Sequence, residues 1–383
     1  MHGLRAAVAG TGFMGTTHIE ALRRMHVEVT GLLGSTLDKG RQAASRLNVP
    51  RVYASFDDLV ADPEVDVVHI CTPNHLHYSM VKAALEHGKH VICEKPVTRT
   101  SRESADLVRL ARRAGVVVAV NYNLRYYPLC HEARARIQAG HIGKVWLVHG
   151  GYLQDWLVLP TDWNWRIDPD LGGELRAVAD IGTHWMDMVT WLTGLRIDAV
   201  LAELTTFIPR RMRMRRSVET FAGKLIHSEE AQETEVRTED CAIILLRFDN
   251  GARGVLTVSQ VSAGRKNRLW WEISGSNASI SWNQERPNEL WIGYRERPNE
   301  VLIKDPALMD AGARAVAGYP GGHAEGYPDT FLRLFEDVYG YISARDFSKT
   351  PTFPTLEDGH RQMVLCEAVL VSARSGTWVD VQA

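Results

Sequence analysis

Three residues of the chain could together move a proton to or from an alcohol. Lys95 stands between Glu94 and Pro96, directly after a short apolar run. Asp180 and His184 stand four residues apart in a helical pattern, and this spacing brings two side chains onto one helix face. A lysine, an imidazole and a carboxylate are typical acid–base groups. We therefore predict that Lys95, Asp180 and His184 form a catalytic set.

Each of these residues also has a simpler interpretation. Asp180 and His184 could hold a metal, although two ligands alone are a weak metal site, or they could form an ordinary ion pair on a helix surface. Lys95 could be a surface lysine before a turn, but the proline after it restricts its backbone and suits a side chain with a fixed direction. His75 and His77 could be metal ligands, and we favour polar groups at a helix start. We expect no metal.

A glycine-rich turn near the N-terminus predicts a dinucleotide cofactor. The apolar run Leu4 to Ala9 is typical of a buried parallel strand. It leads into Gly10-Thr11-Gly12-Phe13-Met14-Gly15 and then into a helical pattern. In this context Gly10 permits a tight turn, Gly12 lets the backbone approach a pyrophosphate, and Gly15 allows helix and strand to pack closely. The N-terminus of the helix attracts the phosphate charge.

The choice between NAD and NADP stays open. An acidic residue that binds the adenosine ribose is expected about 20 residues after the glycines. Ser35 and Thr36 stand there, followed by Asp38, Lys39 and Arg41. A hydroxyl can bind either a ribose or a 2′-phosphate, and the nearby cations suit the phosphate.

The apolar runs indicate an α/β chain with two domains. Short apolar runs at 4–9, 27–33, 52–54, 65–71, 90–93 and 116–120 alternate with helical patterns, which is typical of a doubly wound Rossmann domain. Between residues 198 and 282, strand patterns follow one another without helices, which predicts a large, mostly antiparallel open sheet. Helical patterns follow at 329–342 and about 356–375. We expect a Rossmann domain over residues 1–123 and a C-terminal α+β domain over residues 124–383.

Ligands of open α/β sheets bind at the carboxyl ends of the strands. We therefore expect the residues after these strands to border the cofactor. They are Cys71, Thr72, Pro73, Asn74, His77, Lys95 and Asn121.

A tryptophan-rich loop suggests a sugar site. Trp156, Trp163 and Trp165 lie within one loop. Aromatic rings beside Asp, Asn and Arg suit a sugar, whose C–H face stacks while its hydroxyls form hydrogen bonds. A packing or oligomer loop explains any single tryptophan nearly as well. The substrate candidates are Lys95, Tyr122, Arg125, Gln154, Trp163, Trp165, Arg166, Asp180, His184 and His323.

Composition argues against nucleic-acid and membrane partners. The 383-residue chain has a formal net charge of −2, so no overall field draws it to polyanions. We interpret the basic run Arg210 to Arg216 and the acidic stretch Glu229 to Glu235 as solvated loop faces. No apolar run reaches transmembrane length, and no signal-peptide pattern is present. Five cysteines without C-x-x-C suggest reduced thiols, so we expect a cytoplasmic protein.

In order and spacing, these motifs resemble the glucose–fructose oxidoreductase/inositol dehydrogenase (Gfo/Idh/MocA) family. The resemblance rests on Gly10-x-Gly12-x-x-Gly15, Glu94-Lys95-Pro96 and Asp180-x-x-x-His184. It implies a Rossmann domain, a C-terminal domain with a large open sheet, and a cleft between them. It also implies NAD(P)-dependent oxidation or reduction of a pyranoside or cyclitol, in a homodimer or homotetramer built through the sheets. Glu94 and Pro96 would shape the nicotinamide pocket.

Gln154-Asp155-Trp156, the Asp162–Arg166 loop and Gly172-Gly173 further resemble the levoglucosan dehydrogenase branch. That branch oxidises the C3 hydroxyl of an anhydro-sugar with NAD, so we lean slightly to NAD. The absence of an acidic residue at Ser35 departs from an NAD pattern. We assign His184 as the general base, tuned by Asp180, and Lys95 as the group that stabilises the developing alkoxide. The roles of Lys95 and His184 could be exchanged.

Two other classes of function remain as alternatives. The first is a non-catalytic NAD(P)-binding regulator on the same fold, against which the intact catalytic set argues. The second is a metal-dependent hydrolase that would use His75, His77, Asp180 and His184. Activity that survives chelation and requires nicotinamide would eliminate the hydrolase.

Overall fold

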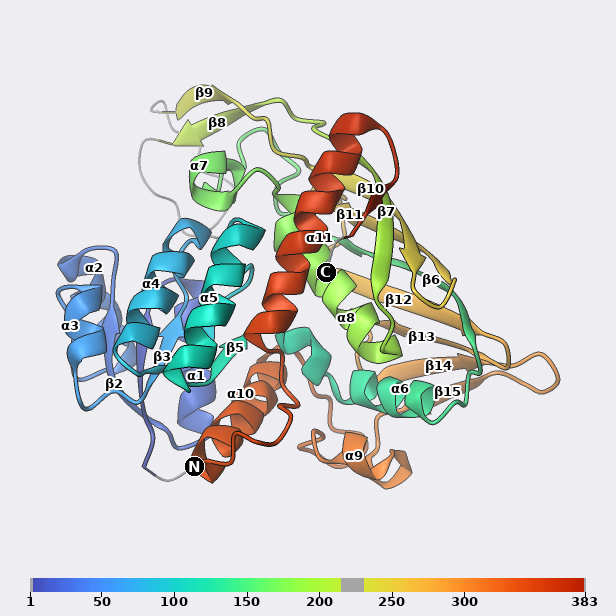
Figure 1. The fold of residues 1–383 in the computed structure, drawn as a ribbon, viewed down its shortest axis with the longest axis horizontal. Helices are drawn as coiled ribbons and strands as arrows, with labels where there is room; N and C mark the ends of the chain where they lie inside the picture. Colours follow the sequence, from blue (N-terminus) through green and yellow to red (C-terminus); the bar gives the residue numbers. More distant parts are fainter. Residues whose placement is uncertain (1–2, 215–230, 382–383) are drawn as a thin grey trace. The chain divides into compact units, whose positions relative to one another are not determined.

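The chain folds into two compact units, shown as a computed structural model in Figure 1. The structure describes residues 3–214 and 231–381. One unit comprises residues 1–123 and 328–363, and the other comprises 124–327 and 364–383. Residues 328–363 therefore differ from the expectation of one continuous C-terminal domain over 124–383. The physical reason is the apolar face of α10 (Tyr327–Ala344), which buries Phe331, Phe335 and Tyr339 within the first unit.

The first unit is built on a five-stranded parallel sheet in the order β2-β1-β3-β4-β5. These strands are β1 (Arg5–Ala9), β2 (Glu28–Leu33), β3 (Val67–Ile70), β4 (His90–Cys93) and β5 (Val118–Val120). All four residues of β3 are buried, as expected for a parallel strand covered on both faces. Of the six predicted strands, the one at 52–54 is wrong, because this short run forms only a single bridge from Val52 to Leu32.

Short polar signals fix the ends of the helices in this unit. The helices are α1 (Phe13–Arg24), α2 (Leu37–Leu47), α3 (Phe56–Ala61), α4 (Asn74–Glu86) and α5 (Ser101–Ala114), and α11 (Leu356–Ser375) begins here. Ser55 and Asp58 form a capping box that starts α3. Gly115 ends α5 with a positive φ of 65°.

The second unit is built on a nine-stranded sheet in the order β15-β14-β13-β12-β6-β11-β10-β7-β16. Its strands are β6 (Val145–Leu153), β7 (Ile197–Thr205), β10 (Cys241–Phe248), β11 (Arg253–Ser259), β12 (Arg268–Gly275), β13 (Ser279–Asn283), β14 (Glu289–Gly293), β15 (Glu300–Ile303) and β16 (Val379–Asp380). All neighbours are antiparallel except β6 and β11, which run parallel. This sheet and the parallel sheet confirm the predicted fold class.

Helices cover one face of the nine-stranded sheet (Figure 1). They include α6 (Pro128–Gln138) and α8 (Thr183–Thr193), and the fully buried Trp185 of α8 donates to the Trp270 carbonyl of β12. Shorter helices are α7 (Pro169–Gly172), α9 (Ala311–Arg314), η1 (Asn123–Tyr126), η2 (Trp165–Ile167), η3 (Val178–Gly182) and η4 (Pro306–Leu308). A separate hairpin pairs β8 (Arg210–Met214) with β9 (Ala231–Glu235). Within the described ranges, no helix is both long and apolar enough to span a bilayer.

Candidate functional site

The glycine turn after β1 has the geometry that a dinucleotide requires. Gly10 has a φ of +116°, and a Cβ there would meet the backbone of Cys71. A Cβ at Gly15 would meet the Gly10 carbonyl, so both positions need glycine for the fold itself. At Gly12, by contrast, a Cβ would find no atom within 4 Å. The open space beside Gly12 fits the approach of a pyrophosphate to the backbone.

The other predicted cofactor residues follow the parallel strands at their carboxyl ends. Cys71, Thr72 and Pro73 are half-buried, and Asn74 begins α4. Ser35 is exposed after β2, and Thr36 beside it accepts a hydrogen bond from the Lys39 N–H to cap α2. The neighbouring cation Arg41 lies 3.6 Å from Asp38, and both side chains are largely exposed.

Asn121 supplies a second sign that a polar ligand binds at this edge. Its Nδ2 donates to the buried carboxylate of Glu94, which is also 3.0 Å from His18 Nε2. Its Oδ1 is buried and has no hydrogen-bond partner among the described residues. A buried acceptor without a donor is costly, so this oxygen fits a donor group such as the carboxamide of a nicotinamide.

Asp180 and His184 lie where the chain passes from an unusual helical turn into α8. Asp180 belongs to η3, which is π-helical, and His184 belongs to the first turn of α8. The expected α-helical spacing between them is thus replaced by a wider turn. Such π-turns occur frequently at functional sites.

Two side chains from outside this helix hold Asp180. Arg166 Nε lies 3.1 Å from one carboxylate oxygen, and Gln260 Nε2 lies 2.8 Å from the other. The Arg166 guanidinium also lies 4.4 Å from the centroid of the Trp165 ring. Arg166, which the sequence analysis assigns to a sugar hydroxyl, therefore has Asp180 as its ion-pair partner.

His184 is 7% exposed and lies beside a hydrogen-bonded group of strand ends. The Tyr152 ring centroid is 6.2 Å from that of His184, and the Tyr152 hydroxyl donates to Asn267 Oδ1 at 2.6 Å. Burial raises the pKa of Tyr152, which keeps the hydroxyl protonated. Gln154 donates to the same Asn267 oxygen at 2.8 Å, and its own Oε1 accepts from Trp156 Nε1. Gln154, predicted from the sequence to contact the substrate, has these protein partners in the structure.

Sequence reasoning missed Tyr152, Gln260 and Asn267. Tyr152 lies near the end of β6, Gln260 directly follows β11, and Asn267 directly precedes β12. Since β6 and β11 run parallel, their carboxyl ends meet at one edge of the sheet. Ligands of open α/β sheets bind at the carboxyl ends of parallel strands. The same expectation would have pointed to this edge if the pairing of β6 and β11 had been known.

Two of the three tryptophans in the tryptophan-rich loop pack against apolar side chains. Trp156 and Trp163 are partly buried against a small hydrophobic cluster of Leu157, Ile167 and Val236. The Arg213 guanidinium lies 5.3 Å from the Trp163 ring centroid. Packing therefore accounts for Trp156 and Trp163, whereas Trp165 is paired with Arg166.

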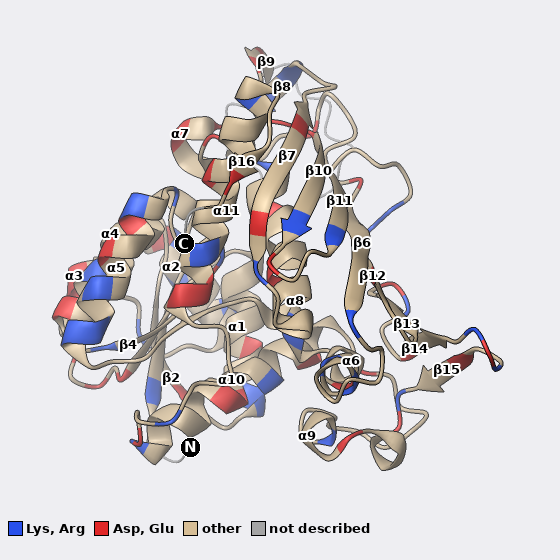
Figure 2. Cartoon of the chain, turned by 45° about the vertical axis from the view of Figure 1, so that its right-hand side comes forward, with Lys and Arg blue, Asp and Glu red and all other residues tan. Residues whose placement is uncertain are grey.

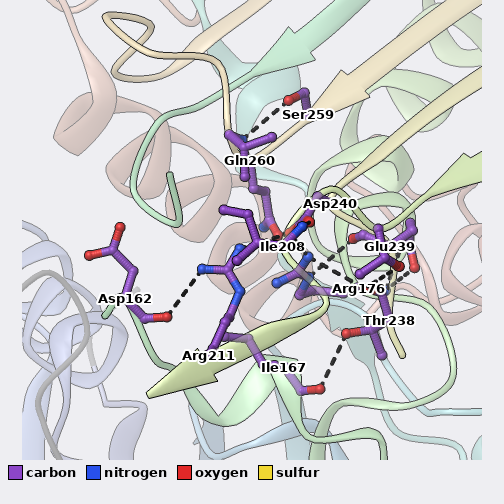
Figure 3. Close-up of polar contacts among 12 residues, drawn as sticks. Asp162, Ile167, Arg176, Ile208, Arg211, Thr238, Glu239, Asp240, Ser259 and Gln260 are labelled. Carbon is purple, nitrogen blue, oxygen red and sulfur yellow. Dashed lines mark hydrogen bonds and ion pairs between the residues drawn. The ribbon is translucent and has the colours of Figure 1, made fainter. Parts of the chain in front are cut away.

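A buried ionic cluster, formed by Arg176, Arg211, Glu239 and Asp240, lies next to this loop (Figure 3). Arg176 and Arg211 both donate to Asp240, and all three side chains are buried. Arg211 also donates to the Leu159 carbonyl at 2.9 Å, and Glu239 accepts from the backbone N–H groups of Arg176 and Val178. The interpretation of the basic run as a solvated face is thus wrong at Arg211. Arg215, Arg216, Glu229 and Glu230 of the charged runs lie outside the described residues.

The remaining predicted substrate residues belong to both units. Arg125 is buried, and its Nε and Nη2 donate to the Asp187 carboxylate. Tyr122 is buried, while His323 is exposed in the loop before α10. Lys95 belongs to the first unit and is half-buried, whereas Asp180 and His184 belong to the second.

The His, Cys, Asp and Glu side chains that the structure describes form no group of three or more suited to a metal ion. His77, one of the ligands of the hydrolase alternative, instead contacts two backbone carbonyls.

Comparison with known proteins matches both halves of the chain to one family. Residues 4–122 match the model described as an oxidoreductase family with an NAD-binding Rossmann fold, and residues 130–281 match the GFO/IDH/MocA C-terminal domain. The levoglucosan dehydrogenase of Pseudarthrobacter phenanthrenivorans is 30% identical over 397 residues, covering 100% of this chain and 99% of that protein.

Solved structures give the same result. A levoglucosan dehydrogenase in complex with NADH and levoglucosan has a TM-score of 0.88 and 29% identity, covering 99% of this chain and 100% of the other. An inositol dehydrogenase homologue from Azotobacter vinelandii in complex with NAD⁺ has a TM-score of 0.86 and 26% identity, covering 98% and 97%.

Proposed function

Because the chain belongs to the Gfo/Idh/MocA family of NAD(P)-dependent oxidoreductases, we propose that it oxidises the C3 hydroxyl of a levoglucosan-like anhydro-sugar. The family and the nicotinamide cofactor define the enzyme as a dehydrogenase of sugar or cyclitol CH–OH groups. The observation that carries the narrower substrate is the match to a levoglucosan dehydrogenase over the full length of both chains.

In this proposal the proton of the substrate hydroxyl passes to His184. An imidazole is the side chain whose ordinary pKa lies nearest neutrality, which suits a general base. Asp180, paired with Arg166 and oriented by Gln260, stabilises the imidazolium that forms. Lys95 stabilises the developing alkoxide. The bound nicotinamide supplies the hydride acceptor, and the exchange of roles between Lys95 and His184 stays an alternative.

The cofactor would lie along the carboxyl ends of the parallel strands. We assign its pyrophosphate to the turn from Gly10 to Gly15 and its adenosine ribose to Ser35 and Thr36. The nicotinamide is assigned to the strand ends and to Asn121, whose buried Oδ1 fits the carboxamide donor. The strand-end residues assigned to the nicotinamide are Cys71, Thr72, Pro73, Asn74, His77, Glu94, Lys95 and Pro96. We propose NAD rather than NADP, because the levoglucosan dehydrogenase structure holds NADH.

For the sugar, we propose contacts from Trp165 and Tyr122 and from the residues around Asp180 and His184. Trp165 offers an aromatic face already paired with a cation. Arg125 and Gln154 now have protein partners, so we assign them to holding the site's shape.

A substrate panel tests the function directly. Levoglucosan, glucose, 1,5-anhydro-sugars and myo-inositol are each incubated with NAD or NADP, and nicotinamide absorbance is followed. We expect the highest kcat/KM with levoglucosan, and a 3-keto product by NMR. Turnover of inositol alone would contradict the anhydro-sugar assignment, and binding of cofactor without turnover of any sugar or cyclitol would favour the regulator.

We also infer that the enzyme is a homo-oligomer that associates through the open face of the nine-stranded sheet. Ile243 and Leu245 are exposed apolar residues of β10, whose alternate residues are buried, and Leu147 of β6 is also exposed. Figure 2 shows these strands largely free of charged residues along their length. Ile243→Asp should reduce the mass measured by light scattering, and a monomeric wild-type protein would contradict the inference.

We further propose a cytoplasmic location, which the free state of all five cysteines supports. Fractionation of the source cells with an antibody against the chain tests it.

A further inference from the structure

Two buried histidines hold the residues on either side of Lys95. The imidazole of His18 in α1 has its Nε2 3.0 Å from the Glu94 carboxylate, before the lysine. The imidazole of His77 in α4 has its Nδ1 2.8 Å from the Pro96 carbonyl, after the lysine. Both histidine side chains are fully buried. The mechanism above gives His18 no role, and it includes His77 only in the set assigned to the nicotinamide.

The contact with His18 keeps the Glu94 carboxylate in one place and ionised. Burial alone raises the pKa of Glu94, but hydrogen bonds from His18 and Asn121 and the charge of Lys95 bring it below its ordinary value. An ionised carboxylate only accepts hydrogen bonds, so His18 Nε2 must carry a proton and donate it.

A chain of buried groups fixes His18 in turn. His18 Nδ1 lies 2.9 Å from His69 Nδ1, and His69 Nε2 lies 2.9 Å from the Tyr339 hydroxyl. Burial lowers the pKa of His69 well below its ordinary value, so this ring carries one proton. These contacts join His18, His69 and the Tyr339 hydroxyl into one buried hydrogen-bonded chain that ends at Glu94.

His77 links two loops at the edge of the sheet. Its Nε2 lies 2.8 Å from the Thr72 carbonyl after β3, while its Nδ1 reaches Pro96 after β4. Because the ring is fully buried between these two carbonyls, its position fixes the distance between the two loops. The backbone that carries Lys95 is thereby held from the neighbouring strand as well.

We propose that His18 and His77 are positioning residues that aim Lys95 at the reacting hydroxyl. A lysine side chain is long and flexible, so its direction depends on the backbone from which it starts. Misplacement of a reacting group by 1 Å can cost about 10²-fold in rate. The inference rests on the proposed catalytic function of Lys95, and in it both histidines act on that lysine through the residues next to it.

Paired substitutions test the proposal. His18→Leu and His77→Leu should each lower kcat about 10- to 100-fold with the sugar KM changed less than about twofold. His18→Gln and His77→Gln should recover part of this loss, because the glutamine amide can replace the imidazole donor. Thr30→Val is the control: its buried hydroxyl donates to the Ala6 carbonyl at 3.1 Å, away from Lys95. We expect this variant to have a lower Tm than the wild type and an unchanged kcat.

The cofactor-free protein provides a second readout. In ¹⁵N-edited NMR, His69 should carry a proton on only one ring nitrogen, and Tyr339→Phe should shift the His69 signals and lower kcat without unfolding the chain. Wild-type kcat in a folded His18→Leu variant, alongside an inactive Lys95→Ala variant, would overturn the inference. Normal turnover in Lys95→Ala would instead overturn the proposed function.

Discussion

At the scale of single residues, the three glycines of the first turn have different tasks. Gly12 has an ordinary φ of −77° and open space at its Cβ position. We therefore expect Gly12→Val to fold with a near-normal Tm and to lose NADH binding, because the new side chain fills the space of the pyrophosphate.

The matched control for this prediction is Gly10→Val. Its Cβ meets the Cys71 backbone and its φ is +116°, so this variant should fail to fold normally. Fluorescence titration of NADH and thermal unfolding separate the two results. An unchanged NADH affinity in folded Gly12→Val would show that the turn does not bind the cofactor.

The second prediction at this scale concerns Ser35 and the choice between NAD and NADP. The exposed hydroxyl after β2 neither repels nor requires a 2′-phosphate. We expect the wild-type enzyme to prefer NAD, and Ser35→Asp to lower kcat/KM for NADP by at least tenfold because a carboxylate repels the phosphate. The measurement is the ratio of kcat/KM for the two cofactors. A wild-type ratio above about 100 toward NADP, equivalent to about 2.7 kcal/mol, would reverse the assignment.

At the scale of elements, the buried ionic cluster fastens the β8–β9 hairpin to the rest of the second unit. Asp240 accepts from Arg176, from Arg211 and from the Ile208 N–H. Asp240→Asn would remove the negative charge that pairs with the buried guanidinium groups of Arg176 and Arg211. Loss of one partner from a buried pair typically costs about 3–5 kcal/mol, so we expect the free energy of unfolding in urea to fall by that amount.

Glu233→Gln is the control for the cluster. Its pairing with Arg210 joins two exposed side chains of the same hairpin at 3.5 Å. Exposed pairs contribute about 0–1 kcal/mol, so this variant should unfold almost like the wild type. If Asp240→Asn is equally harmless, the cluster does not hold the hairpin.

This cluster also shows which elements could be predicted from the sequence. The strand–glycine–helix order near residue 10 depends on neighbouring residues, and it was predicted correctly. The burial of Arg211 depends on Asp240, which follows after the whole hairpin, so a basic run read locally suggests a solvated face. The π-turn at Asp180 and the packing of α10 onto His18 and His69 likewise depend on contacts that are distant in sequence.

At the scale of the whole molecule, the proposed catalytic set draws on both units. Lys95 follows β4 in the first unit, whereas Asp180 and His184 stand at the start of α8 in the second. Motifs so distant in the sequence would serve one reaction only if both units act on the same hydroxyl. This arrangement makes a specific prediction about how substitutions in the two units combine.

General acid–base groups typically contribute about 10²–10⁴-fold to the rate, so Lys95→Ala and His184→Ala should each lower kcat by about that factor. If both act on the proton of one hydroxyl, the double variant should lose much less than the product of the two single losses, because the second substitution removes a group that no longer has a partner. His184→Ala should hardly change the Kd of NADH, since the cofactor residues lie in the first unit. The measurements are kcat at saturating sugar and cofactor for the four members of the cycle, with NADH titration of each. Strictly multiplicative losses would mean that the two residues act independently, and near-normal turnover in both single variants would mean that the catalytic assignment is wrong.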